Sequence, residues 1–203
     1  YDRTREAGMT TPTRPRGRRP GRSDTQGTIR AAANTLFLRD GYEKVSLRAV
    51  AREAEVDPAL VHHYFASKAA LFLLALTGAT WEVERDVTSV LDGPTEGVGR
   101  RAVRLLLEHQ GPTAPAPLEN LMDGPNGDGV ARARAAIEMV AREVFFPVAT
   151  HFGHVDATLR AQLAASALVG VQLGRRTSRP HATSQALLGP LARTLQYYLV
   201  DPW

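Results

Sequence analysis

The chain has 203 residues, of which 43% are apolar and 23% charged, and this composition excludes wholesale disorder and collagen-like or low-complexity chains. It contains no cysteine, which excludes disulfide scaffolds, cysteine nucleophiles and thiolate zinc sites. The net charge is +4, but seven arginines against two acidic residues give residues 1–22 a charge of +5, and the remaining 18 basic and 19 acidic residues give −1.

Residues 1–22 end in TTPTRPRGRRPGR, a stretch with no apolar periodicity that predicts a flexible arm. The positive charge therefore belongs to this arm and not to the body. No run of about 18 apolar residues is present, and the N-terminus lacks an apolar signal segment. We therefore expect a cytoplasmic protein without membrane contact.

The first predicted helix starts at Thr25 and ends at Asp40-Gly41, because glycine adopts the left-handed conformation of a helix C-cap. Its apolar residues recur at the spacing of an amphipathic helix. The residues of this periodic face are Ile29, Ala32, Ala33, Leu36 and Phe37.

A second, short helix is predicted from Ser46, a good N-cap residue. Asp57-Pro58 then combines an N-cap residue with proline at the first helical position, which is a strong start signal for a third helix. This third helix is predicted to direct Val61 and Tyr64 inward.

Ser67 is predicted to cap a fourth helix that extends as far as Leu91, weakened at Gly78. Further helices are expected over 100–109, over 130–146 up to an interruption at Pro147, and over 159–176 and 184–200. Loops are expected over 92–99 and 111–129, which are rich in Gly and Pro. No segment shows the alternation of a β-strand, so the fold class is all-α.

Short helices with a tight break between the second and third are typical of a helix-turn-helix, whose second helix lies in the DNA major groove. The segments LFLRDGYEKVSLRAVA and AREAEVDPALVHHYF, followed by Ser67-Lys68, resemble the TetR family of bacterial transcriptional regulators over residues 23–83. The resemblance implies about nine helices. It also implies a division into the arm 1–22, a DNA-binding domain 23–83 with its helix-turn-helix at 46–65, and a ligand-binding and dimerisation domain 84–203.

The resemblance further implies that Ser46 and Lys68 contact DNA phosphates near helix N-termini. Glu55 stands where the family usually has glycine, so the turn places a side chain in left-handed geometry at a cost of about 1 kcal/mol. Tyr64 has the alternative of reaching a phosphate through its hydroxyl. The other residues expected to meet DNA are Arg48, Asp57, Pro58, Ala59, His62 and His63, and, from the arm into a narrow minor groove, Arg16, Arg18, Arg19 and Arg22.

Large side chains in the C-terminal part are candidates for lining a ligand cavity, with core packing as the alternative. They are Trp81, His109, Met122, Met139, Phe145 and Phe146. The last two helices carry small and apolar residues suited to an intersubunit four-helix bundle, although half of that stripe must face the protomer's own core. The interface candidates are Leu163, Ala167, Val171, Leu188, Leu191 and Leu195.

His151 and His154 are spaced like metal ligands but lack a third partner, so we expect no metal and no cofactor. No phosphate-binding loop, dinucleotide or hydrolase motif supports catalysis. We expect a homodimeric regulator, a repressor rather than an activator, that binds double-stranded DNA at a pseudo-palindromic operator and is released by a small-molecule effector. The alternatives are a ligand-independent dimeric regulator, and an enzyme or interaction module that carries a helix-turn-helix.

Overall fold

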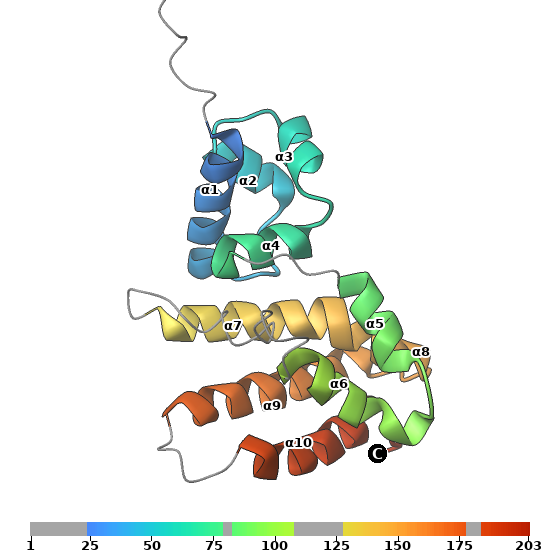
Figure 1. The fold of residues 1–203 in the computed structure, drawn as a ribbon. Helices are drawn as coiled ribbons and strands as arrows, with labels where there is room; N and C mark the ends of the chain where they lie inside the picture. The colour runs from blue at the N-terminus through green and yellow to red at the C-terminus, as the bar shows by residue number, and fades with distance from the viewer. Residues whose placement is uncertain (1–23, 79–82, 108–127, 178–183) are drawn as a thin grey trace, which may run out of the picture.

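The computed structural model places a small helical head on a larger helical body, as Figure 1 shows. It describes residues 24–78, 83–107, 128–177 and 184–203. These ranges contain helices and no β-strand, so the predicted all-α fold is confirmed. The head consists of α1 (Thr25–Asp40), α2 (Leu47–Glu53), α3 (Pro58–Tyr64) and α4 (Lys68–Thr77).

The described part of the body contains α5 (Val83–Leu91), the 3₁₀ turn η1 (Thr95–Gly97), α6 (Val98–Leu107), α7 (Gly129–Val140), the π-helical turn η3 (Ala141–Phe145), α8 (Phe146–His151), α9 (Ala157–Thr177) and α10 (Ser184–Leu199). The segments α7, η3 and α8 follow one another without a break. With these three counted as one, the described ranges hold nine helices besides η1, in agreement with the number that the family resemblance implies. No single helix among them is long and apolar enough to cross a membrane; α3 and α4 satisfy that test only as a pair, and this pair is bent by 76°.

Side-chain caps fix where the helices of the head begin. In each case a side-chain oxygen accepts a hydrogen bond of 2.7–3.1 Å from a backbone N–H two or three residues later. Such a cap stabilises a helix by about 1 kcal/mol because it satisfies an N–H that has no partner within the helix. The capping residues are Asp24 for α1, Ser46 for α2, Asp57 for α3 and Ser67 for α4, and the last three are the predicted ones.

Three aromatic rings hold the base of the head together. Phe37 of α1, Tyr42 of the following loop and Phe72 of α4 are fully buried, and their ring centres lie 5.0–5.8 Å apart. Edge-on and offset aromatic pairs contribute about 0.5–1.5 kcal/mol each beyond the area that they bury. The predicted inward face of α1 is confirmed, since its five apolar residues are buried: Ile29, Ala32, Ala33, Leu36 and Phe37.

The predicted continuous helix from Ser67 to Leu91 is wrong. The helix α4 ends at Thr77, and Gly78 follows with φ of 72° while its N–H donates to the carbonyl of Leu74. This left-handed cap with its bond back into the last turn is a common helix ending that glycine adopts without steric cost. The chain leaves the head there, and α5 is a separate helix of the body.

The predicted interruption at Pro147 is also wrong. Proline removes an N–H, and its ring conflicts with the carbonyl four residues earlier, so it normally breaks a helix. Here the wider turn η3 precedes it, with the N–H of Phe146 bonded to the carbonyl of Ala141 five residues before. The register shift lets Pro147 sit in the first turn of α8, and the helical rod continues to His151.

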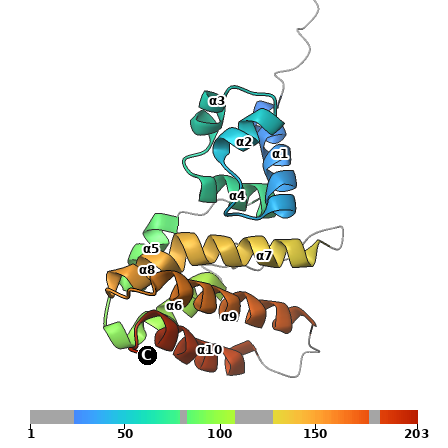
Figure 2. The ribbon, with the colours of Figure 1, turned by 180° about the vertical axis from the view of Figure 1, so that it is seen from behind.

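The body packs around α9, which contacts α7, η3, α8 and α10. The most extensive contact in the body joins α6 to α10, and Figure 2 shows α9 beside both α7 and α10 from behind. The side chains of Leu191 and Leu195 on α10 are buried within this single chain. These two candidates for the subunit interface therefore belong to the protomer's own core.

Candidate nucleic-acid interface

The helices α2 and α3 pack against each other through a turn with a defined hydrogen-bond pattern. Val56 N–H donates to the carbonyl of Ala51 over 3.0 Å, and Glu55 N–H donates to that of Arg52 over 3.2 Å. This pair of bonds is the Schellman ending, in which the residue after the helix is left-handed. Glu55 has φ of 54°, so the structure confirms the predicted left-handed side chain in the turn.

The helix α3 presents one exposed face and one buried residue. Val61 is fully buried between α3 and the rest of the head, whereas Pro58, Ala59, His62 and His63 are exposed. Tyr64 is 41% exposed, so the prediction that it points inward is wrong.

Leu60 is a further exposed residue of α3 that was not predicted to face outward. Its side chain is 38% exposed and lies next to the exposed Ala59 in the chain. The helical periodicity of α3, in which the apolar face contains Val61, is the signal that could have predicted an exposed Leu60.

The residues at the starts of α2 and α3 cap these helices, in addition to any contact that they make with DNA. Ser46 Oγ accepts a hydrogen bond from Ala49 N–H, and the exposed hydroxyl keeps its own proton for donation. Asp57 Oδ1 accepts from Ala59 N–H over 2.7 Å, which gives this carboxylate the role of a cap. Arg48 is exposed on α2.

Lys68 is turned toward the base of the head. Its ammonium lies 4.2 Å from the centre of the Tyr42 ring and donates a 3.4 Å hydrogen bond to the carbonyl of Glu43. Burial lowers the pKa of this half-buried lysine, and the carboxylate of Glu43 acts in the opposite direction. An ammonium has three N–H donors, so the contact with Glu43 leaves donors for a phosphate.

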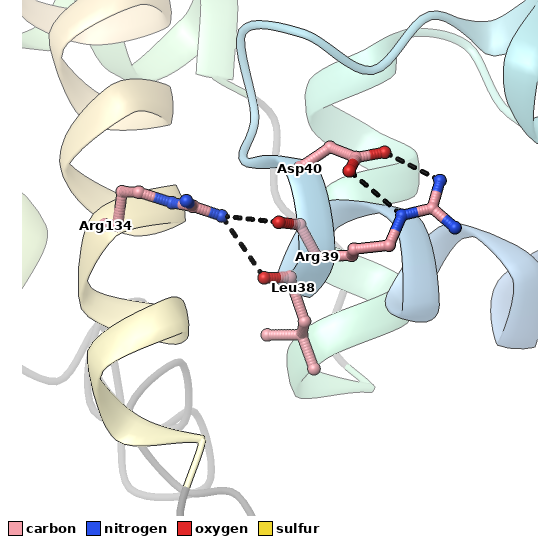
Figure 3. Close-up of polar contacts among 4 residues, drawn as sticks. All are labelled: Leu38, Arg39, Asp40 and Arg134. Carbon is pink, nitrogen blue, oxygen red and sulfur yellow. Dashed lines mark hydrogen bonds and ion pairs between the residues drawn. The ribbon is translucent and has the colours of Figure 1, made fainter.

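Four side chains of α7 and η3 bind the head, and two of them are arginines. Arg134 donates to the carbonyls of Leu38 and Arg39 at the end of α1, over 3.2 and 3.0 Å, where the helix dipole favours a cation (Figure 3). The buried Arg132 donates to the carbonyl of Leu76 in α4 over 3.1 Å.

The other two contacts of this junction involve carboxylates. Glu138 Oε2 accepts from Glu43 N–H over 2.9 Å, and Glu143 Oε1 accepts from the hydroxyl of Tyr42 over 2.7 Å. Burial raises the pKa of Tyr42, and the hydrogen bond to Glu143 raises it further. The head is therefore attached to α7 and η3 at the end of α1, along the loop that follows it, and at the end of α4.

The residues predicted to line a ligand cavity or a subunit interface lie outside the helix-turn-helix. Met139 and Phe145 are fully buried in the body, while Phe146 is partly exposed and lines a cavity beside α7. Leu163, Ala167, Val171 and Leu188 are half-buried on α9 and α10.

Among the described residues, no three potential metal ligands gather at one place. The arginines Arg16, Arg18, Arg19 and Arg22 and the cavity candidates Trp81, His109 and Met122 lie outside the described residues.

The packed pair α2–α3, with the solvent-facing side of α3 and an exposed arginine on α2, defines a helix-turn-helix DNA-binding protein. Residues 29–75 match the family model described as bacterial regulatory proteins, tetR family. Residues 96–199, about half of the chain, match the model of the tetracyclin repressor-like C-terminal domain. The protein belongs to the TetR family of bacterial transcriptional regulators.

Individual proteins similar to this chain are described as regulators or repressors. The chain is 32% identical over 72 residues to the HTH-type transcriptional regulator HbdR of Aromatoleum sp. (strain CIB), a match that spans 36% of this chain and only 31% of that protein. A solved TetR-family regulator from Streptomyces coelicolor A3 is 29% identical, covering 91% of this chain and 99% of that one, with a TM-score of 0.43. NalD, the secondary repressor of the MexAB-OprM multidrug efflux pump in Pseudomonas aeruginosa, is 24% identical over 88% of this chain and 98% of its own, with a TM-score of 0.33.

Proposed function

We propose that this protein is a homodimeric transcriptional repressor that binds a pseudo-palindromic operator and is released by a small-molecule effector. The observation that carries the proposal is the exposed face of α3, with Ala59, His62 and His63 projecting from a helix whose start is capped and whose Val61 is buried. Two copies of such a helix reach successive major grooves when they stand about 34 to 36 Å apart.

The proposed contacts divide into two kinds. Ser46, Arg48 and Lys68 bind phosphates and position the head, while the side chains of α3 read base edges. His62 and His63 offer ring N–H groups as donors, and Tyr64 offers its hydroxyl. The arm arginines Arg16, Arg18, Arg19 and Arg22 are proposed to add minor-groove contacts.

The proposed subunit interface uses the outer side of α9 together with α10. Leu163, Ala167 and Val171 are half-buried along α9, and Leu159 on the same helix is 51% exposed. Small residues on this side allow two helices to approach closely. Leu188 continues this surface on α10, whereas Leu191 and Leu195 contribute to it only by supporting the core beneath.

Regulation is proposed to act through the junction of the head with α7 and η3. An effector shifts the equilibrium between two head arrangements only as far as its affinities for the two differ. The hydrogen bonds of Arg134, Glu138 and Glu143 to the head are short and specific, so a displacement of α7 or η3 is transmitted to α1 and to the loop that leads to α2.

The test is operator selection from random duplex DNA with the full chain, followed by titration of the selected DNA with Arg48→Ala at several salt concentrations. We expect weaker binding and a salt slope shallower by about 2 per dimer, because each head loses one phosphate contact. Arg100→Ala, which removes an exposed arginine from α6 in the body, is the matched control and leaves both unchanged. Selection of no duplex sequence, or equal salt slopes for the two variants, contradicts the proposal.

A further inference from the structure

A cavity of about 240 Å³ opens at the junction between the head and the body. Its walls come from α7, η3 and α8 on one side and from α9 on the other, and Glu43 of the head stands at its edge. Apolar side chains form much of its surface, among them Ile137, Ala141, Phe146 and Ala161. Drug-sized pockets enclose about 300–1,000 Å³, so this cavity suits a molecule with one ring and a short chain.

The charge of the cavity lining is unbalanced. It includes the carboxylates of Glu43 and Glu138 and one guanidinium, that of Arg142. Glu138 is partly compensated, because it accepts from Glu43 N–H and lies 4.0 Å from Arg134 Nε. The carboxylate of Glu43 has no ion pair within 4 Å among the described residues, and its charge interacts at longer range with Lys68. The lining therefore carries two carboxylates against one guanidinium, and this formal charge favours a cation over an anion.

The ring of Phe146 favours the same class of ligand. It is 36% exposed, and the guanidinium of Arg142 lies over it with the central carbon 6.0 Å from the ring centre. Aromatic faces attract cations because of the negative charge density above the ring. Arg142 is exposed and has no ion pair within the described part of the chain. A cationic ligand can therefore take the place of its guanidinium over the ring of Phe146.

We propose that this cavity binds a small amphipathic monocation, an aromatic amine in the simplest case. The apolar ring lies against Ile137, Ala141 and Ala161, and the ammonium donates hydrogen bonds to Glu43 and Glu138. Since Glu138 also accepts from the backbone of Glu43, the ligand binds at a contact that fixes the head on α7. Its effect on operator affinity rests on the proposed function, whereas its binding does not.

Three probes with the same ring and different charge test the binding by ligand-observed NMR titration of the full chain. They are 2-phenylethylamine, 2-phenylethanol and 3-phenylpropionate. We expect the amine to bind with a Kd on the order of 1 mM or tighter, and at least about tenfold more tightly than the other two. Equal affinities, preference for the carboxylate, or no binding of any probe overturns the proposal.

Variants locate the site. Glu43→Gln and Glu138→Gln each weaken binding of the amine about tenfold, and the amide introduced at position 138 still accepts from Glu43 N–H, so the junction is retained. Arg142→Ala strengthens binding, because the competing cation is gone. Glu96→Gln removes an exposed carboxylate of η1 outside the cavity and leaves the affinity unchanged. Equal loss in all three glutamate variants overturns the assignment of the site.

Operator titration with and without saturating amine tests the regulatory consequence separately. We expect the affinity of the wild-type protein for its selected operator to change, and that of Glu138→Gln to change less. An unchanged operator affinity in the presence of bound amine overturns the regulatory role. Absence of operator binding by the unliganded protein is a failure of the proposed function and leaves the NMR result standing.

Discussion

Among the described residues, Glu55 is the only non-glycine residue in a left-handed conformation, and its neighbours explain why. The Schellman bonds of Glu55 and Val56 to the end of α2 require that conformation, and they set the angle at which α3 leaves α2. The strain of a side chain there costs about 1 kcal/mol, which the capped and packed pair of helices offsets.

Substitution at this position separates the strain from the turn. Glu55→Gly is expected to leave the free energy of unfolding unchanged or raise it by up to about 0.5 kcal/mol, since relief of strain is partly offset by the entropy of glycine. Glu55→Val is expected to lower it by about 1–2 kcal/mol, because a β-branched residue is unfavourable at positive φ. Urea unfolding at a fixed protein concentration measures both. A valine variant as stable as the wild type contradicts this account.

Among the helices, α6 and α10 cross so closely that only glycine fits at position 99. A Cβ on Gly99 would overlap the carbonyl oxygen of Ala192 and lie 2.6 Å from the backbone nitrogen of Gln196. The Gln196 side chain completes the contact, since its Oε1 accepts from Gly99 N–H and its Nε2 donates to the carbonyl of Thr95, both over 2.9 Å. The position of α6 against α10 is therefore fixed by backbone approach and one amide.

The change Gly99→Ala is expected to lower the free energy of unfolding by about 1–3 kcal/mol, because the neighbouring atoms belong to backbone and cannot move aside cheaply. Gly129→Ala at the start of α7 is the control, since a Cβ there meets nothing within 4 Å, and its stability stays equal or rises slightly. Thermal unfolding compares the two. Equal melting temperatures for both variants would show that α6 and α10 do not approach as described.

Across the molecule as a whole, head and body meet through residues about 100 positions apart in the chain. Tyr42 belongs to the aromatic group of the head and also donates to Glu143 of η3, so one side chain connects the packing of the head with the π-helical turn. Lys68 above its ring links the same group to the start of α4.

The variant Tyr42→Phe keeps the ring and removes the hydroxyl. We expect the free energy of unfolding to fall by about 1–2 kcal/mol at neutral pH, because Glu143 loses a hydrogen-bond donor. Tyr197→Phe, at an exposed tyrosine of α10, is the control and leaves stability unchanged. A Tyr42→Phe protein as stable as the wild type contradicts the role of this bond.

The same pair of proteins has a defined pH dependence. Because the pKa of Tyr42 is raised in the folded state, the folded chain keeps this proton after the unfolded chain has lost it. The stabilisation is therefore complete below the pKa of an unfolded tyrosine, about 10, and is lost as the pH rises above it. Unfolding measured from pH 8 to 11 should show the difference between wild type and Tyr42→Phe decreasing, and a constant difference contradicts the raised pKa.

Local signals in the sequence predict most of the elements and the core of the helix-turn-helix. Caps such as Ser46 and Asp57 act within three residues, and the left-handed turn at Glu55 is implied by the resemblance to a family that usually has glycine there. Position within the helix does not determine whether a large amphipathic side chain is buried or exposed. Tyr64 shares the helical face expected to be inward, yet it is exposed, whereas the next residue, Phe65, is buried where the helix ends.

Sequence alone was enough to predict the all-α class, the starts of the head helices, the exposed side of α3 except for Tyr64 and Leu60, and the family to which the chain belongs. Packing in three dimensions settled that Leu191 and Leu195 face the protomer's own core. The end of α4 at Thr77 and the π-helical turn η3 before Pro147 are local features that the prediction missed. Packing also settled the bonds between the head and α7. The difference is one of range: caps and periodicity act over a few residues, whereas the bond from Tyr42 to Glu143 exists only once both helical layers are packed.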